Sequence, residues 1–430
     1  MRFTSPRARI WTSLTALACS LPIAFAQNPP PPSQPDSEKI EPVKTSITVS
    51  GTLSAEAPVS LEVVDRRTIE QAPGVNIDDR LRNVPGFTLF RRSSSLVANP
   101  TTQGVSLRGL GSSGASRSLV LWDSIPLNDP FGGWIYWTRL APDDIERVEV
   151  LRGGSTSIFG DRSLAGSIGL FSRAAQRWHL RVSDEAGNRN TNELGAAFSQ
   201  VFRALNQDWA VSARTRFFTT NGYFIVPEAN RGFIDTEAGV RFATGAVTVD
   251  WLGHNQRFST KLDVLAEDRA NGTVLQRNST SIGTLSAQYS RDWSKDGITI
   301  LGYRTQEEFH ASFSSVPGGR RTEALTSLQQ VPSEASGAAG YWRHAQGAFT
   351  TLAGADFEYV DGNSNERLFP TGFRTGGGTR LTHGLFGQAQ IRTGRWSWFG
   401  GARHTFTGDD RFFSPSGGLA VGLGIFRLRG

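Results

Sequence analysis

The sequence predicts a mainly β protein, in which a small N-terminal α+β domain precedes an antiparallel transmembrane β-barrel. Three observations support this prediction. From Arg177 onward, short segments of alternating polar and apolar residues recur, with aromatic residues near their ends. Short turns and longer polar loops alternate between these segments, which is typical of outer-membrane barrels. After the N-terminus no run of 18 apolar residues occurs, so we expect no transmembrane helix.

The first part of the chain, residues 1–26, is predicted to be an export signal. A basic start and an apolar stretch lead to Ala24–Ala26, whose small residues match a cleavage site. A membrane anchor and a lipid-modified Cys19 are the alternatives, but the apolar stretch is short and Pro22 interrupts it. Cys19 is the single cysteine, so we expect no disulfide and no cysteine-ligated metal in the mature chain.

A Pro-rich tether, residues 27–44, follows the signal and is expected to be extended and without a core. Residues 45–51 are β-prone, because apolar and hydroxyl side chains alternate there. Taken alone, this segment would be a plain first strand. Its alternating residues are Thr45, Ser46, Ile47, Thr48, Val49 and Ser50.

The α+β domain is predicted at residues 58–174. It begins with a strand at Pro58–Val64, and Asp65 is placed to cap a helical turn. Asn76–Val84 is predicted as a short amphipathic helix, which Pro85 and Gly86 would end. Its apolar face comprises Ile77, Leu81 and Val84.

The barrel region is predicted at residues 177–430, with twelve strands. A soluble β-sandwich is the alternative, but it would not need the short–long rhythm of connections or so many aromatic residues near strand ends. The predicted strands are 178–184, 192–202, 208–219, 233–243, 246–255, 279–291, 297–309, 333–343, 347–359, 380–392, 395–406 and 416–428. The predicted longer loops are 220–232, 256–278, 310–332, 360–379 and 407–415.

The order of elements from Val59 to about Arg173 is similar to the plug domain of TonB-dependent outer-membrane receptors of the siderophore and cobalamin type. The most specific motif is the run DDIERVEVLRGGSTSIFGDRSLAGSIGLFS, and its spacing from the upstream LRGLG also fits. Trp122 and Ser124 depart from the usual small turn of the family, and Gly154 replaces a common proline. The resemblance implies a plug followed by a barrel.

The predicted strand number is then about half of the roughly 22 strands of a plugged transporter barrel. An open half-barrel would leave unpaired edges in lipid, which backbone hydrogen bonding disfavours. We therefore expect the sequence to be a fragment or a truncated reading frame. A closed 12-strand barrel is the rival interpretation, but its lumen would be too narrow for the plug.

The resemblance also assigns roles to individual segments. Residues Thr45 to Ser50 resemble the TonB box, which adds a strand to the energy-coupling protein TonB. Arg108 and Arg152 match the family arginines that pair with carboxylates on the inner barrel wall and hold the plug in place. The alternative is that each is a solvated arginine at a strand end.

Ligand contacts are expected from plug loops that would point outward. Their arginine and aromatic side chains suit a large, flat or anionic ligand, such as a ferric chelate or a corrinoid. Alternatively, the tryptophans pack the plug against the wall. The candidates are Arg91, Arg92, Asn99, Asn128, Asp129, Trp134, Tyr136 and Trp137.

The implied function is energy-coupled uptake of a scarce nutrient, such as a ferric siderophore or cobalamin, across the outer membrane of a Gram-negative-type bacterium. The partners would be TonB with its inner-membrane energising complex, the ligand and outer-membrane lipid, and we expect a monomer. No catalytic, cofactor, metal or nucleic-acid-binding motif is found, so we do not expect an enzyme. The alternative is a truncated, non-transporting remnant or a receptor fragment that only signals or binds.

Overall fold

The computed structural model describes residues 60–91, 93–110, 113–153, 159–423 and 426–429. The N-terminal domain contains a five-stranded sheet in the order β1-β6-β7-β4-β5 and a separate β2–β3 hairpin, in which the strands pair antiparallel except for β4 with β7. Its strands are β1 (Ser60–Asp65), β2 (Phe87–Leu89), β3 (Val105–Leu107), β4 (Leu119–Trp122), β5 (Ile125–Pro126), β6 (Ile145–Arg152) and β7 (Gly166–Ser172). Its helices are α3 (Arg66–Gln71), α4 (Ile77–Arg80), η1 (Leu81–Asn83), η2 (Pro100–Thr102), η3 (Trp137–Arg139), η4 (Pro142–Asp144) and η5 (Asp161–Ser163).

Local sequence signals explain these elements. The Asp65 side chain accepts a hydrogen bond from the Thr68 backbone amide at 2.8 Å and so caps α3, as predicted. The predicted apolar helix face is buried too, with Ile77 and Leu81 fully buried and Val84 5% exposed. This face joins the core of the domain, whose largest members include Trp137, Ile135, Ile145, Ile168 and Leu170.

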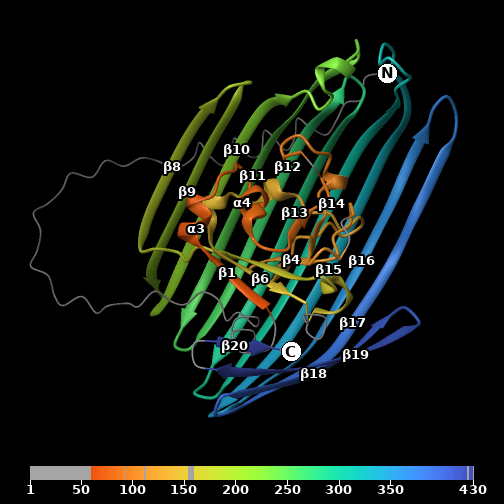
Figure 1. The fold of residues 1–430 in the computed structure, drawn as a ribbon. Coiled ribbons are helices and arrows are strands. Elements are labelled where there is room, and N and C mark those ends of the chain that lie inside the picture. Colours follow the sequence, from red (N-terminus) through yellow and green to blue (C-terminus); the bar gives the residue numbers. More distant parts are fainter. Residues whose placement is uncertain (1–59, 92, 111–112, 154–158, 424–425, 430) are drawn as a thin grey trace, which may run out of the picture. The chain divides into compact units, whose positions relative to one another are not determined.

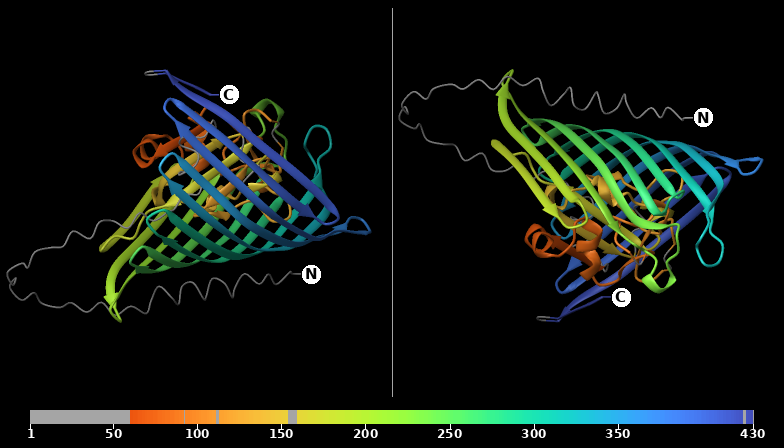
Figure 2. Two further views of the ribbon diagram at one scale, coloured as in Figure 1. Left: turned by 90° about the horizontal axis from the view of Figure 1, so that it is seen from below. Right: turned by 90° about the horizontal axis from the view of Figure 1, so that it is seen from above.

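A single antiparallel sheet forms the rest of the described chain, and we call it the wall. Its strands follow one another in chain order from β8 to β20, and the N-terminal domain lies on its concave face (Figure 1, Figure 2). The edge strands β8 and β20 each pair with one neighbour among the described residues. The wall strands are β8 (Trp178–Gly187), β9 (Thr191–Ala204), β10 (Gln207–Tyr223), β11 (Asp235–Gly253), β12 (Gln256–Thr273), β13 (Arg277–Asp292), β14 (Asp296–Ser315), β15 (Ala324–Gln346), β16 (Phe349–Leu368), β17 (Phe373–Thr393), β18 (Trp396–Thr407), β19 (Asp410–Leu423) and β20 (Phe426–Arg429). A short helix, η6 (Glu228–Asn230), lies between β10 and β11.

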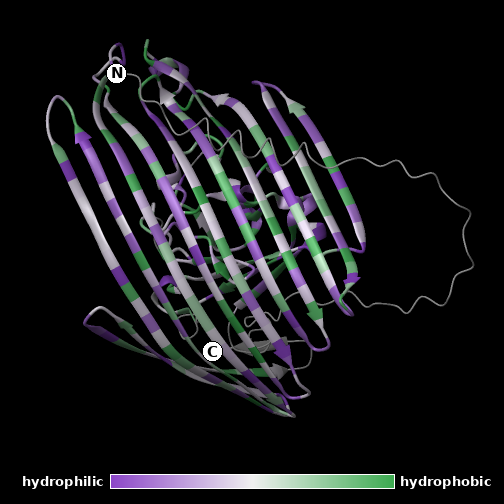
Figure 3. Ribbon diagram, turned by 180° about the vertical axis from the view of Figure 1, so that it is seen from behind, coloured by the Kyte–Doolittle hydropathy of each residue, from purple (hydrophilic) through white to green (hydrophobic). Residues whose placement is uncertain are grey.

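Polar and apolar side chains alternate along the wall strands. On β12, Lys261, Asp263 and Glu267 are 7% exposed or less, whereas Phe258 and Leu262 are 43% and 48% exposed. Successive strand residues point to opposite faces, so the polar set faces the N-terminal domain and the apolar set faces outward. Figure 3 shows the resulting mixture of hydrophilic and hydrophobic bands along each strand. An outer apolar face is what a lipid-facing strand requires.

The predicted fold class is confirmed, but several predicted boundaries are wrong. Residues 233–243 and 246–255 belong to one strand, β11, and the loop predicted at 256–278 contains β12. These two errors cancel in the count, so twelve strands were predicted and the wall has twelve strands of ten or more residues, β8 to β19, besides the four-residue β20. Ala243, Thr244 and Gly245 suggested a turn, but β11 continues through them. Ala243 and the following Ala246 are each 6% exposed, and Ala246 belongs to the core cluster of the N-terminal domain.

The strands are also longer than predicted. The loop predicted at 407–415 is wrong, because β19 begins at Asp410, and the strand predicted at 416–428 is divided between β19 and β20. A strand needs only about 9–11 residues to cross a bilayer. The strands from β9 to β19 continue past that length, and their polar ends have the composition of loops. Among the described residues, no helix is long and apolar enough to span a membrane.

Candidate functional site

The two ends of the wall differ in their connections. At one end every link is two or three residues long, at 205–206, 254–255, 293–295, 347–348 and 394–395. The other end carries the longest connections, at 224–234 and 316–323. In outer-membrane barrels the short turns face the periplasm and the long loops face outward. We therefore call these the inner end and the outer end.

Loops of the N-terminal domain reach the outer halves of the wall strands. Phe131 lies against Gly362 of β16, where a Cβ atom would clash with the Phe131 ring. Val97 lies close to Gly222 of β10, where a Cβ atom would be 3.0 Å from the valine Cγ1. The ring centroids of Trp134 and Phe309 of β14 are 5.9 Å apart. These contacts place two segments, 93–104 and 128–135, toward the outer end.

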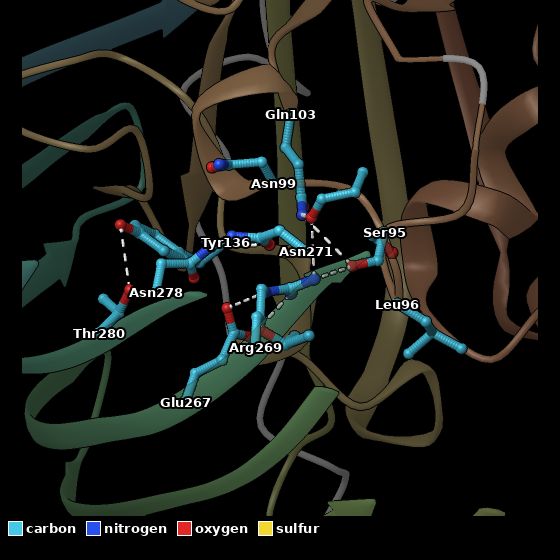
Figure 4. Close-up of polar contacts among 12 residues, drawn as sticks. Ser95, Leu96, Asn99, Gln103, Tyr136, Glu267, Arg269, Asn271, Asn278 and Thr280 are labelled. Carbon is cyan, nitrogen blue, oxygen red and sulfur yellow. Dashed lines mark hydrogen bonds and ion pairs between the residues drawn. The ribbon is translucent and has the colours of Figure 1, made fainter. Parts of the chain in front are cut away.

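Arg269 of β12 holds the first of these segments (Figure 4). Its guanidinium donates hydrogen bonds to the backbone carbonyls of Ser95 at 2.6 Å and Ala98 at 3.0 Å. Two further bonds, at 2.5 and 2.9 Å, join it to Glu267 on the same strand face. Gln103 donates to the same two carbonyls. A charged wall residue and a glutamine of the loop therefore share the same two loop carbonyls, which ties the loop to β12.

A second contact row comes from the segment that leads into and forms η3. The Tyr136 hydroxyl donates to Glu307 at 2.7 Å, and the Thr138 hydroxyl donates to Glu267 at 2.5 Å. Arg139 forms an ion pair with Asp263 and donates to Thr284 at 2.9 Å. The row therefore joins one short segment of the N-terminal domain to β12, β13 and β14.

Burial changes the acid–base behaviour at this row. Burial, then the carboxyls of Glu307 and Asp129, raise the pKa of Tyr136 well above its usual value, so its hydroxyl remains a donor. Burial also raises the pKa of Asp129, whereas the hydrogen bonds that it accepts from Glu307 and from the Gly132 amide lower it by less. Two facing carboxyls in a buried site favour sharing one proton.

Further contacts between the N-terminal domain and the wall lie at other positions along the wall strands. Lys261 of β12 forms an ion pair with Asp123 at 2.9 Å, and its ammonium lies 3.0 Å from the centroid of the Trp122 ring. Arg162 is 2.7 Å from Glu358 of β16. Sequence reasoning missed all of these wall residues. A usable signal was present, because charged residues occupy alternate positions of β12.

The two arginines predicted to lock the plug do not make these contacts. Arg152 forms an ion pair with Glu62 of β1 and donates to the Ser60 hydroxyl at 3.1 Å, so its partners lie within the N-terminal domain. Arg108 is exposed and has a positive φ of 59°, and its guanidinium lies near Gly153. Their locking role stays a prediction, whereas Arg139 and Arg162 are arginines of the N-terminal domain that this structure joins to wall carboxylates.

Most of the predicted ligand residues have structural partners. Trp137 is fully buried and Tyr136 is 1% exposed, which argues against direct ligand contact by either. Arg91 pairs with Asp78 inside the domain, and burial, then Arg269, lower its pKa to about 9. Asp129 is 5% exposed.

The remaining candidates also carry local structure. Asn99 accepts a hydrogen bond from the Thr101 amide, and Asn128 accepts one from the Val120 amide. Trp134 is half-buried against Tyr136 and Phe309. Arg92 and the Thr45 to Ser50 segment lie outside the described residues. Phe131, which is 41% exposed, was missed because it resembles a core residue in the sequence.

A polar-lined wall with an apolar outer face carries a small α+β domain on its concave side. The family model described as the TonB-dependent receptor plug domain matches residues 54–167. The similarity noted in the sequence is thereby confirmed for these residues, which match the plug domain of TonB-dependent receptors. From here on the N-terminal domain is called the plug.

Relatives and solved structures agree with this assignment. The hemin receptor of Yersinia enterocolitica is 34% identical over 170 residues, which are 39% of this chain and 23% of that protein. The vitamin B12 transporter BtuB of Vibrio vulnificus is 23% identical over 263 residues, which are 56% of this chain and 42% of that protein. These names denote a receptor and a transporter, in agreement with the prediction that the chain is not an enzyme. The chain spans less than half the length of either relative.

Solved structures show the same fold at low sequence identity. The ferric citrate transporter FecA in its unliganded form has a TM-score of 0.67 at 14% identity, over 87% of this chain and 62% of that one. The siderophore receptor PirA from Acinetobacter baumannii has a TM-score of 0.65 at 13% identity, over 89% and 62% of the two chains.

Proposed function

We propose that this protein serves energy-coupled uptake of a scarce nutrient across the outer membrane, as the plug and part of the wall of a receptor. Residues 1–26 would direct export, residues 27–44 would act as a tether, and Thr45 to Ser50 would pair with TonB by adding a strand. Ligand would bind at the outer end, and pulling on the tether would loosen the plug. The protein would then reside in the outer membrane.

The observation that carries this proposal is the way in which the plug is attached. Many of its contacts with the wall are hydrogen bonds and ion pairs, such as Arg139 with Asp263 and Tyr136 with Glu307. They interrupt the apolar contacts, in which Trp134 and Tyr136 pack near wall residues such as Phe242. Polar contacts of this kind can be exchanged for water when the plug moves, whereas a continuous apolar interface would resist wetting. An attachment of this type suits a domain that must stay closed at rest and open under force.

The ligand class is proposed to be a ferric siderophore or cobalamin, and the hemin receptor among the relatives adds hemin as a third candidate. Aromatic residues at the outer end favour a large, flat ligand. Phe131 on the plug is 41% exposed, and Phe233 and Phe373 near the wall loops are 96% and 82% exposed.

An uptake assay tests the proposal. Cells that produce the chain are offered radiolabelled ferric siderophore, cobalamin and hemin, in strains with and without TonB. The proposed function predicts that one ligand accumulates and that its accumulation falls to background without TonB. Binding to the cell surface without TonB-dependent accumulation would favour the binding-only alternative. No binding of any of the three ligands would overturn the proposed ligand class.

A further inference from the structure

A cavity of about 70 Å³ lies between the plug and the inner halves of β10 to β13. On the wall side it is lined from Ser212 and Arg214 of β10 to Gln288 and Ser290 of β13, close to the short turns. On the plug side it is lined by the β4–β5 turn and by the segment that follows β7. It is therefore separate from the outer end, where we place the transported ligand.

The cavity has an excess of positive charge. Its charged lining residues are Asp123, Arg173, Arg214, Asp250, Arg257 and Lys261, four basic and two acidic. Two of the basic side chains are neutralised within the cavity, because Lys261 pairs with Asp123 at 2.9 Å and Arg257 pairs with Asp250 at 2.7 Å.

The other two basic side chains, Arg173 and Arg214, have no ion pair within 4 Å in the part of the chain that the structure describes. Among the described residues, the Arg214 side chain donates only to the Ser172 hydroxyl, at 3.3 Å. Burial lowers the pKa of Arg173, and Arg66 and Arg181 lower it further, while Glu146 and Asp144 act in the opposite direction. A positive charge in this partly dry space is stabilised by an anion.

One end of the cavity already binds a carboxylate. Asp123 accepts hydrogen bonds from the Ser172 amide at 2.8 Å, the Ser172 hydroxyl at 2.7 Å and the Lys261 ammonium at 2.9 Å. Trp122 fixes both neighbours, since its ring lies under Lys261 and its indole N–H donates to the Ser172 hydroxyl at 2.7 Å. Amides, hydroxyls and cations that converge in this way are the donors that oxyanions prefer.

We propose that this cavity binds one small oxyanion, a phosphate or a carboxylate, between Arg214 and Arg173. The hydroxyls of Ser212 and Ser259, which also line the cavity, are available as further donors. The volume holds a few water molecules, and one tetrahedral or planar oxyanion fits the same space. The oxyanion is either free phosphate or an acidic group carried by a chelate on its way to the periplasm. Binding of the free anion does not depend on uptake.

Calorimetric titration of the purified full chain in detergent tests the proposal, with inorganic phosphate in one arm and ferric citrate in the other. We expect Arg214→Gln and Arg173→Gln each to weaken binding at least tenfold, and Arg214→Lys to retain part of it because the charge remains. The matched control is Arg241→Gln, which loses the same charge from an exposed pair with Asp268 on the outer face.

The pattern of losses decides between the possibilities. Selective loss of phosphate binding supports a site for the free anion, and selective loss of ferric citrate binding supports a site for acidic groups of a chelate. Binding that is absent, or equal in all variants that keep the native far-UV circular dichroism, overturns the proposal. If Arg214→Gln fails to fold, Arg173→Gln gives the same test, because Arg173 lies outside the strands.

Discussion

Replacing Arg139 by methionine is expected to weaken the seating of the plug strongly. The side chains of Arg139 and Asp263 are 4% and 8% exposed, so removal of the arginine leaves a buried carboxylate without its partner. Breaking a buried ion pair in this way costs about 3–5 kcal/mol. At about 3 kcal/mol, the equilibrium between seated and released plug changes by roughly a hundredfold.

Urea titration in detergent, followed by tryptophan fluorescence, measures this loss. With an m-value of about 2 kcal/mol/M for a domain of this size, the midpoint of plug release should fall by about 1.5 M. The control Arg241→Met breaks a pair whose side chains are 60% and 27% exposed, and should cost less than about 1 kcal/mol.

The double variant Arg139→Met with Asp263→Leu provides the sharper test. Replacing both partners by apolar residues leaves no unpaired charge, so most of the lost stability should return. The reasoning is refuted if the single variant behaves like the Arg241 control, or if the double variant is as unstable as the single one.

Two further predictions concern the plug. Burial raises the pKa of Asp129, so this carboxyl binds a proton more readily in the folded plug than in the unfolded chain. The stability that the proton contributes is full below about pH 4 and is lost as pH rises through the folded-state pKa. Asp129→Asn should therefore flatten the dependence of the urea midpoint on pH between about 4 and 8, and an unchanged slope would contradict this prediction. Phe131→Ala should lower surface binding of the transported ligand several-fold while changing the free energy of plug release by no more than about 1 kcal/mol, because the ring is 41% exposed. Equal binding by the variant and the unaltered protein would remove Phe131 from the ligand site.

Local patterns in the sequence were sufficient for much of the fold. The buried helix face of Ile77, Leu81 and Val84 follows from the helical period of side chains. The alternation of polar and apolar residues in the wall follows from the two-residue period of a strand. The ends of the strands could not be predicted, because a strand that extends beyond the bilayer has the polar composition of a loop.

The site was less predictable, for a different physical reason. Arg139 and Asp263 are 124 residues apart, and no local pattern indicates which plug cation meets which wall carboxylate. Composition also does not separate an aromatic ligand contact from a core residue. Trp137 was therefore selected although it is fully buried, and Phe131 was overlooked although it is exposed.

The central claim is that a strand formed by residues 45–51 couples this plug to TonB, and one substitution tests it most directly. Proline cannot donate a backbone hydrogen bond to a neighbouring strand, so Thr48→Pro should disrupt strand addition while Thr48→Ala should not. The measurement is accumulation of labelled ligand by cells that produce either variant, compared with binding at the cell surface. The account predicts that Thr48→Pro binds ligand normally but accumulates none. Equal accumulation by the proline and alanine variants would contradict it.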